Sequence, residues 1–314
     1  MILTVTPNPC VDKTVYVDTL RLGTFIRSPK YTCIPGGKGT NVSRAVKQLG
    51  GETAAFVVVG GHTGRHVVEM IENQDGVECI PAWVRDATRT ITTVLETSNH
   101  RQTALFEPGP RLTPEEVRRI LNQFEQVLPR ATLVTFNGTV SDPIAKHLYQ
   151  EMIALAKAQG ILTLLDSHGE EMALGIEAVP HMVKPNIAEL EELWGEPLPS
   201  IKEIGKAAEA LHQKGIELVV VSRGKEPLLI SSITGERLIA YPPEIKEVNP
   251  VGSGDALVAA FAMGLAEGKT LEHMAKLGCA AGAANAMSWD IGHFSSEEIN
   301  RLLPLVRVEH LKSD

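Results

Sequence analysis

The sequence has no excess of basic residues. Its 30 Lys and Arg are outnumbered by 38 Asp and Glu, which gives a formal net charge of −8 at pH 7. Nucleic-acid-binding proteins present a basic face, so this balance argues against a nucleic-acid partner. An acidic protein also gives an anionic ligand no general attraction. Any anionic substrate would therefore need a local cluster of basic side chains.

Paired cysteines and long apolar runs are also missing. Cys10, Cys33, Cys79 and Cys279 form no CxxC pair and have no metal-ligand spacing, so we expect free thiols in a reducing compartment. No apolar run reaches ~18 residues, so no membrane span is expected. Residues 1–9 lack a basic segment and break at prolines, which predicts a first strand and not a signal peptide. Together these absences predict a cytoplasmic protein with no membrane partner.

Three common cofactor motifs are absent. Residues 264–270 come close to a P-loop but have three residues between the glycines where that loop needs four. Gly252-x-Gly254 has Leu257 where GxGxxG needs its third glycine, so a dinucleotide-binding dehydrogenase is poorly supported. His62 and His66 have a spacing that suits zinc, but no HExxH glutamate or third ligand accompanies them. We expect both to be exposed histidines on a helix surface.

What is present is a repeated alternation of apolar strands and amphipathic helices. Strands are expected at 2–6, 54–59, 131–136, 161–166, 181–184 and 218–222, with a hairpin at 228–233 and 236–241. Helices are expected at 42–49, 61–72, from the capping box at 113–116, and at 142–157, 187–194, 201–214, 255–267, 271–287 and 296–306. This alternation is typical of an α/β protein with a parallel sheet covered by helices.

Two stretches depart from the alternation. Residues 14–17 and 27–33 predict short strands of mixed polarity, and residues 90–96 and 102–106 predict a hairpin that turns at 98–100. We expect the hairpin to pair with the earlier strands in a small separate sheet, formed by about 12–34 and 88–106.

The stretch from Asn249 to Leu257 is the most informative in the chain. Gly252 and Gly254 permit a tight turn, and a helix is expected to begin at or just before Asp255. The amides at a helix N-terminus bind anions, so a carboxylate placed there suggests a base that takes a proton beside a transferring anion. Asp255 could equally be a helix cap, and this stretch alone leaves both readings open.

Two further polar clusters lie near expected helix starts. Gly36, Gly37, Lys38 and Gly39 precede Asn41, and we favour binding of a polar ligand over a plain turn because each glycine costs backbone entropy. Lys184, Asn186 and Glu189 follow a buried strand, where open α/β sheets bind ligands. Taken alone, Asn186 and Glu189 are better explained as a capping box.

In order and spacing, these clusters resemble the ribokinase-like (PfkB) carbohydrate kinases along nearly the whole chain. The resemblance rests on residues 6–9 with Asp12, on 36–42, 88–89, 184–189, 222–224 and 249–255. It implies one kinase domain over 1–314, built as a three-layer αβα sandwich with a mostly parallel central sheet and a small β-sheet lid. It also implies ATP, Mg²⁺ and phosphoryl transfer to a hydroxyl of a ketohexose phosphate, and it leaves a requirement for a monovalent cation open.

The resemblance also assigns residues to parts of the site. Asp255 becomes the catalytic base, and Gly252, Ser253 and Gly254 form the anion hole with it. The sugar contacts are Asp12, Gly36, Gly37, Lys38, Asn41 and Asn137, and the ligands of the existing phosphate are Arg27 and Arg89. The nucleotide side comprises Lys184, Asn186, Glu189, Ser222, Gly224, Asn285 and Ser288, with Asn186 and Glu189 acting indirectly on magnesium.

Departures from the family pattern keep two alternatives open. Residues 137–141 and Pro227 differ from the usual sugar-phosphate and nucleotide segments. A binding regulator with little activity is therefore one alternative, and a kinase for a free sugar or nucleoside is the other. We also expect a homodimer through the lid sheets, since Val15, Val17, Ile91 and Val94 would need a cover on one face of a small sheet.

Overall fold

The computed structural model describes residues 1–99 and 101–311. Within them, ten strands form one sheet in the order β14-β13-β12-β11-β10-β9-β8-β1-β4-β5. Their bounds are β1 Ile2–Thr6, β4 Thr53–Gly60, β5 Glu78–Val84, β8 Leu133–Asn137, β9 Leu162–Asp166, β10 Met182–Val183, β11 Leu218–Arg223, β12 Glu226–Ser232, β13 Arg237–Tyr241 and β14 Arg307–His310. The strands from β11 to β5 pair in parallel, and β12 to β14 extend the sheet in antiparallel fashion.

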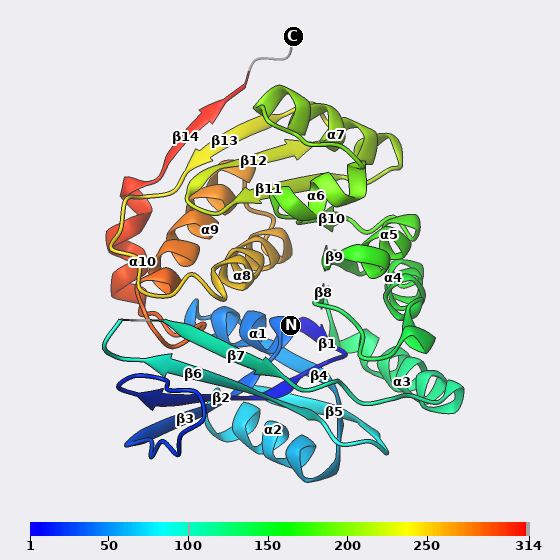
Figure 1. The fold of residues 1–314 in the computed structure, drawn as a ribbon. Coiled ribbons are helices and arrows are strands. Elements are labelled where there is room, and N and C mark those ends of the chain that lie inside the picture. The colour runs from blue at the N-terminus through cyan, green and yellow to red at the C-terminus, as the bar shows by residue number, and fades with distance from the viewer. Residues whose placement is uncertain (100, 312–314) are drawn as a thin grey trace.

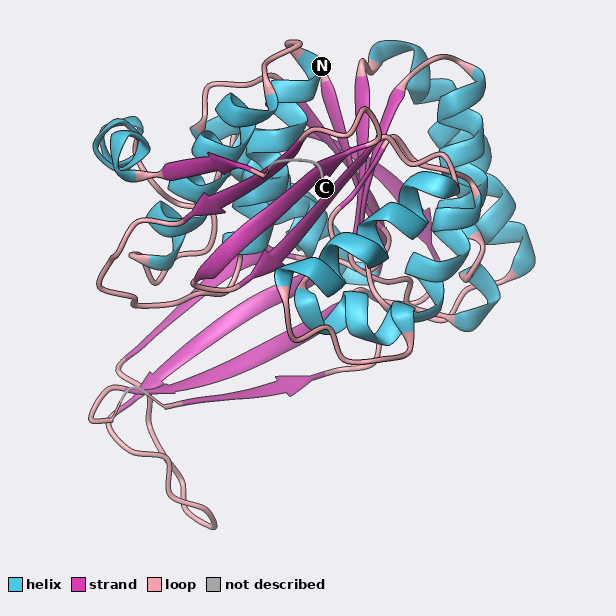
Figure 2. Ribbon diagram, turned by 90° about the horizontal axis from the view of Figure 1, so that it is seen from above, coloured by secondary structure: helices cyan, strands magenta, loops and turns pink. Residues whose placement is uncertain are grey.

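Helices cover both faces of this sheet, as Figures 1 and 2 show. One face carries α3 Pro114–Val127, α4 Leu148–Ala158, α5 Gly169–Glu177, α6 Ile187–Trp194 and α7 Ile201–Gln213. The other carries α1 Lys38–Gln48, α8 Ser253–Ala266, α9 Leu271–Ala286 and α10 Ser296–Leu302. The predicted αβα sandwich is therefore confirmed.

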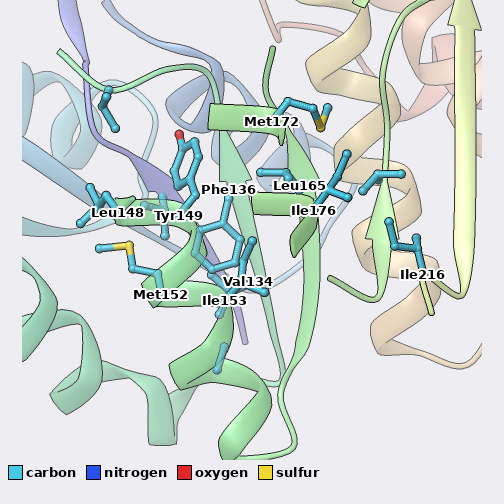
Figure 3. Packing of buried hydrophobic residues seen from close by; sticks show 14 of the residues in the cluster. Val134, Phe136, Leu148, Tyr149, Met152, Ile153, Leu165, Met172, Ile176 and Ile216 are labelled. Carbon is cyan, nitrogen blue, oxygen red and sulfur yellow. The ribbon is translucent and has the colours of Figure 1, made fainter. Parts of the chain in front are cut away.

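The core on the first face is built from strand residues that alternate inward against the apolar stripes of the helices. Phe136 packs between Phe124 and Tyr149, with ring centroids 6.0 and 5.7 Å away, and Met152 and Ile153 lie beside them (Figure 3). All five side chains are fully buried. Such burial is the main stabilising term for the sheet that carries the site at its edge.

Three elements escaped the sequence reading, and one predicted helix is broken. The strand β5 contains Pro81 and lies at the edge of the sheet, the one place where a strand tolerates proline. The short, charged β14 is the opposite edge, and α5 is a short helix after β9. The helix expected at 142–157 splits into a 3₁₀ turn at Pro143–Ala145 and α4, with His147 between them.

The predicted small sheet is confirmed, and we call it the lid. Its strands β2 Cys10–Val17, β3 Lys30–Gly36, β6 Arg89–Glu96 and β7 Gln102–Phe106 form a sheet in the order β3-β2-β6-β7. The helix α2 Gly61–Asn73 packs behind it (Figure 1). The hairpin of β6 and β7 joins the earlier strands through β6, which pairs in parallel with β2. Ser98 and Asn99 lie in the expected turn, and His100 lies outside the described residues.

One expectation about the lid is wrong. Val15 pairs with Val94, but Ile91 pairs with Asp12, an odd number of residues away along each strand. Because side chains alternate between the faces of a strand, Ile91 lies on the opposite face from Val15 and Val94. Ile91 belongs to the cleft face of the lid, so the four apolar residues do not form one surface.

Two expectations about single residues are confirmed. The four cysteines are free thiols, and His62 and His66 are exposed on α2. No cluster of three His, Cys, Asp or Glu side chains suited to a metal ion occurs in the described part of the chain. None of the described helices is long and apolar enough to cross a membrane.

Candidate active site

A cleft of about 1400 Å³ lies between the lid and the carboxyl ends of the parallel strands. Fourteen of the predicted site residues line it, from six separate segments of the chain. They are Asp12, Gly37, Lys38, Asn41, Arg89, Lys184, Asn186, Glu189, Ser222, Gly224, Gly252, Ser253, Gly254 and Asp255. The fold thus brings together most of the motifs that the sequence singled out.

The turn into α8 forms the floor of the cleft. Gly252 is the N-cap of α8 with φ +84°, a conformation that favours glycine. A Cβ built on Gly252 would lie 2.3 Å from Cγ2 of Ile291, so the site has no room for a side chain. The first α-helical bond runs from the N–H of Ala256 to the carbonyl of Gly252. The amides of Gly254 and Asp255 therefore precede the helical ladder and are suited to an anion in the cleft.

Asp255 is buried in the first turn of α8, with only 6% of its surface exposed. Burial and the neighbouring Asp166 carboxylate raise its pKa to about 7, against the pull of Lys38, Asn41 and Lys184. The Nδ2 of Asn41 donates a 2.8 Å hydrogen bond to Oδ2 of Asp255. A carboxylate with a pKa near neutrality is ionised in a substantial fraction of molecules at physiological pH and is basic enough to accept a proton. The helix-cap reading is not supported, since Gly252 occupies the cap and no side chain caps α8.

Asp166 is a site residue that the sequence reading missed. It ends β9, is fully buried, and lies 3.0 Å through Oδ1 from Nζ of Lys184 and 3.7 Å from Nζ of Lys38. Burial alone would raise its pKa, but the two ammonium groups outweigh burial and lower it. Its Oδ2 has no hydrogen-bond partner in the described chain. A charged residue directly after the buried, largely apolar stretch Leu162–Leu165 was the available signal.

The capping box that the local sequence pattern predicts is formed by Asn186 and Glu189. The Asn186 side chain accepts from the N–H of Glu189 at 2.9 Å, and Oε2 of Glu189 accepts from the N–H of Asn186 at 2.8 Å. The other oxygen, Oε1, lies 3.7 Å from Nζ of Lys38 in the cleft. Glu189 therefore serves as a cap and still offers an oxygen to the site. The Asp166 carboxylate raises the pKa of Lys38, which stays protonated.

Arg89 lies at the root of the lid, where β6 begins. Its Nη2 donates a 3.3 Å hydrogen bond to the carbonyl of Asn8. Its Nε is buried and finds no hydrogen-bond partner in residues 1–99 and 101–311. Asp12, on the adjacent strand, has a pKa that burial raises and Arg44 partly lowers. Arg89 is thus a cation with an unused donor on the lid side of the cleft.

Five predicted site residues do not line the cleft. Arg27 lies in the exposed segment between β2 and β3. Gly36 ends β3, where a Cβ would lie 2.5 Å from Sγ of Cys10. The Oδ1 of Asn137 accepts from Thr135 at 2.7 Å, and its Nδ2 is buried with no partner in the described chain. The contacts proposed for these three residues with the sugar or its phosphate remain predictions.

Asn285 and Ser288 lie behind the α8 turn. The Nδ2 of Asn285 donates to the carbonyl of Val251 at 2.8 Å and to Oγ of Ser253 at 3.1 Å, and its Oδ1 accepts from the N–H of Gly292 at 2.7 Å. These bonds fasten the α8 turn to α9. The Oγ of Ser288 accepts from the N–H of Asp290 at 3.1 Å. Their assignment to the adenine side remains a prediction.

The small residues of α9 have a second role, in the cleft, that was not predicted from the sequence. We expected them only to permit close packing, and Gly278 does lie against Leu257 and Phe261 of α8. The same helix also lines the cleft. The α9 residues that line it are Gly278, Cys279, Gly282, Ala283 and Ala286. Their short side chains occupy little of the space of the cleft.

A helix N-terminus open to a cleft, a buried carboxylate beside it and flanking lysines are together typical of phosphoryl transfer. The profile of the pfkB family carbohydrate kinases matches residues 5–289. The chain is 34% identical to a 1-phosphofructokinase of Bacillus subtilis over 99% of this chain and 100% of that protein. It is 32% identical to a tagatose-6-phosphate kinase of Staphylococcus epidermidis, over 98% and 99% of the two chains. A solved structure of phosphofructokinase-2 from Escherichia coli in complex with potassium matches 96% of this chain and 98% of its own, with 28% identity and a TM-score of 0.89.

The fold and the cleft are therefore those of a kinase. The chain belongs to the pfkB family of carbohydrate kinases.

Proposed function

We propose that residues 1–314 act as one kinase domain that transfers the γ-phosphoryl group of ATP to a hydroxyl of a ketohexose phosphate. The observation that carries this proposal is Asp255, a buried carboxylate with a pKa of about 7 at the open N-terminus of α8. The relatives named above as kinases of fructose 1-phosphate and tagatose 6-phosphate support this class of acceptor.

In this proposal Asp255 takes the proton of the attacking hydroxyl as the phosphoryl group arrives in line. The bond from Asn41 holds the carboxylate in place. The amides at the start of α8 stabilise the negative charge of the transferring group, and Lys38 balances charge on the acceptor side. Positioning and charge stabilisation supply most of the rate, because phosphoryl transfer requires little other chemistry from the protein.

The residues present also fit a magnesium ion. Oδ2 of Asp166 has no hydrogen-bond partner within the described chain, and Oε1 of Glu189 faces the cleft. Mg²⁺ prefers oxygen ligands and is typically held by one or two carboxylates together with substrate phosphates. Asp166 and Glu189 would hold it, directly or through water, and Asn186 would fix Glu189 through the capping box. The ion neutralises phosphate charge when it is bound.

The phosphate already present on the acceptor is assigned to Arg89. Arg89→Ala should raise the KM for the sugar phosphate about 10- to 150-fold, the equivalent of roughly 1.5–3 kcal/mol for a charge-assisted bond. The KM for ATP should stay within about twofold, because the lost contact concerns one substrate. Steady-state kinetics with each substrate varied in turn measures both constants.

Two further variants sharpen this experiment. Arg101→Ala is the matched control, since Arg101 pairs with Glu96 and does not line the cleft. Arg27→Ala tests whether the exposed Arg27 contributes to the same phosphate. If Arg89→Ala and Arg27→Ala both leave the sugar-phosphate KM unchanged, neither arginine binds the phosphate of the acceptor. A free sugar then becomes the favoured acceptor.

We also propose a homodimer formed through the lids. The segment between β2 and β3 carries Leu22 and Phe25, which are 91% and 107% exposed. The edge strand β7 adds Leu105 and Phe106, at 62% and 68%. Phe106 pairs with Ile91 on the cleft face of the lid, and Leu105 lies on the opposite face. Large exposed apolar side chains on the lid and on its β2–β3 segment mark an interaction surface, and a second lid offers a matching one.

Light scattering at micromolar concentration should therefore report a dimer. Phe25→Asp should shift it toward the monomer, because a charge would be buried at the interface. Ile233→Asp is the control, since Ile233 is 46% exposed but follows β12 on the large sheet. A wild-type monomer, or equal effects of the two substitutions, would contradict the lid dimer.

The alternative of a binding regulator is separated from the kinase by turnover. ADP release should be measured with fructose 1-phosphate, fructose 6-phosphate, tagatose 6-phosphate and free fructose, and binding should be followed by calorimetry in parallel. We expect turnover on at least one of the three phosphates, with a kcat/KM well above that for fructose. Tight binding with no turnover on any of them would favour the regulator.

A further inference from the structure

Arg44 is a charged side chain outside the cleft lining that is completely buried. It lies on α1, one turn after Asn41. A guanidinium group carries five N–H donors and no acceptor, so its burial is tolerable only when those donors are satisfied. A buried arginine whose donors lacked partners would destabilise the folded protein.

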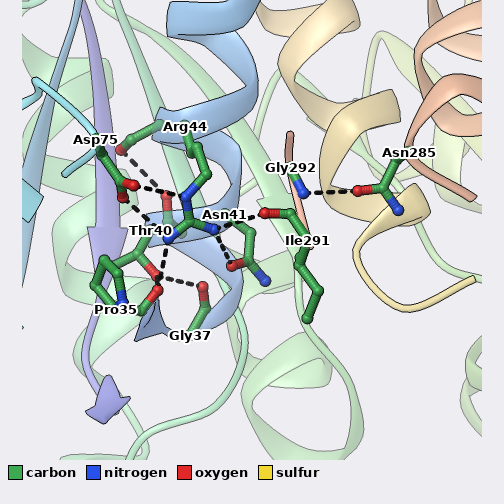
Figure 4. A network of polar contacts seen from close by, with 11 residues as sticks. Pro35, Gly37, Thr40, Asn41, Arg44, Asp75, Asn285, Ile291 and Gly292 are labelled. Atoms are coloured by element: carbon green, nitrogen blue, oxygen red, sulfur yellow. Dashed lines mark hydrogen bonds and ion pairs between the residues drawn. The ribbon is translucent and has the colours of Figure 1, made fainter. Parts of the chain in front are cut away.

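The network around Arg44 accounts for all five donors (Figure 4). Nε and Nη2 donate to the two carboxylate oxygens of Asp75 at 2.8 and 2.9 Å. Nη2 also donates to the carbonyl of Pro35 at 2.7 Å, next to the root of the lid. Nη1 donates to the carbonyl of Ile291 at 3.0 Å and to Oδ1 of Asn41 at 3.1 Å. Arg44 therefore joins segments that are as much as 247 residues apart in sequence.

The bond to Asn41 decides how that amide is oriented. Because Arg44 can only donate, the atom of Asn41 that faces it must be the oxygen. The amide nitrogen then points the other way, toward Oδ2 of Asp255 at 2.8 Å. An ionised carboxylate can only accept, so this orientation suits Asp255 in the form that takes a proton.

We propose that Arg44 is a positioning residue that locks the Asn41 amide with its N–H toward the Asp255 carboxylate. This inference rests on the proposed role of Asp255 as the base. Arg44 reaches neither substrate nor the reacting atoms, and it acts through Asn41. Without it the amide can rotate and turn its oxygen toward Asp255, which replaces an attraction with a repulsion.

The test is Arg44→Lys, which keeps the charge beside Asp75. A lysine has three donors on one atom and cannot serve Asp75, Pro35, Ile291 and Asn41 together. We expect kcat to fall about tenfold, the size of one lost hydrogen bond to a charged group, with the KM for ATP within about twofold. In an Asn41→Ala background, Arg44→Lys should have almost no further effect on kcat, because the residue it acts through is gone.

Asp75→Asn is the matched control. It weakens the same buried ion pair but leaves the Arg44–Asn41 bond in place, so it should lower the melting temperature and leave kcat within about twofold. If Arg44→Lys does not fold, Arg44→Met with Asp75→Leu removes both charges together, and this replacement is often tolerated in a protein core. It should show the same loss of kcat.

The inference is overturned if a folded Arg44 variant keeps the wild-type kcat, or if its loss is as large with Ala at position 41 as with Asn. It is also overturned if Asp75→Asn lowers kcat as much as Arg44→Lys does. If instead Asp255 is not the base, the Asp255→Asn variant would retain turnover, and this result distinguishes the two failures. An inactive Asp255→Asn variant combined with additive effects at positions 41 and 44 would refute the Arg44 inference alone.

Discussion

Asp255→Asn should lower kcat by roughly 10²–10⁴, the usual range for the loss of a general base. The substitution preserves the shape of the side chain and can keep a hydrogen bond from Asn41, so substrate KM values should change little. Asparagine cannot accept the proton, and the remaining rate would come from the α8 amides and from binding. Coupled measurement of ADP release gives kcat directly. A variant with near-normal turnover would rule out Asp255 as the base.

The same substitution should stabilise the folded protein at neutral and alkaline pH. Folding raises the pKa of Asp255 from its ordinary 3.8 to about 7, so this group opposes folding increasingly as pH rises from about 4 to 7. Below pH 4 the carboxyl is protonated in both states and costs nothing. The neutral amide of the variant has no such penalty, so the gain should be on the order of 2–4 kcal/mol at pH 8 and much smaller at pH 4. Urea unfolding at both pH values measures it, and an equal gain at both would contradict the raised pKa.

Gly252→Ala should have the second largest effect. The residue has φ +84°, and its new Cβ would lie 2.3 Å from Ile291, so the α8 turn must shift. We expect a loss of about 1–3 kcal/mol in the free energy of unfolding from strain and repacking. We expect a decrease of roughly 10²–10³ in kcat, because the amides that face the transferring group move. Denaturant unfolding and ADP release measure the two effects.

Gly254→Ala is the control for stability. A Cβ there would meet only Nζ of Lys184, at an ordinary 3.7 Å, and the residue lies in the first turn of α8. An alanine in a helix is more favourable than a glycine, so this variant should be as stable as the wild type or slightly more stable. Equal destabilisation by the two substitutions would show that the special conformation of Gly252 is not what matters.

The sequence was sufficient for the order of strands and helices because apolar periodicity reports burial directly. It failed where an element is short or lies at an edge. No strand was predicted at 78–84, a segment that contains Pro81, but an edge strand such as β5 has one side free of ladder bonds and accepts a proline. The lid shows a different limit. Its strands were predicted, but whether Val15 and Ile91 share a face depends on the register between β2 and β6. That register cannot be read from the sequence of either strand alone.

The site was predictable where its residues lie in compact motifs. Lys38, Asn41, Gly252 and Asp255 fall in glycine-rich stretches, and the structure places all four on the cleft. Asp166 is a single residue at the end of a strand, and its burial and its two lysine partners become visible only in the folded structure.

Arg44 is the extreme case. In the sequence it is one charged residue of a predicted helix, and four of its five hydrogen bonds go to residues outside that helix. Long-range polar partners are set by the tertiary fold, which local patterns do not encode.

The pH dependence of kcat, measured at saturating concentrations of both substrates, tests the central claim most directly. If Asp255 is the base, the wild-type kcat should rise with pH along a limb whose apparent pKa lies near 7, and then level off. The residual rate of Asp255→Asn should lack this limb between pH 5.5 and 8.5, a window of roughly 1.5 units on either side of that pKa. A limb that persists in Asp255→Asn, or a wild-type kcat that does not change across this window, would contradict the assignment.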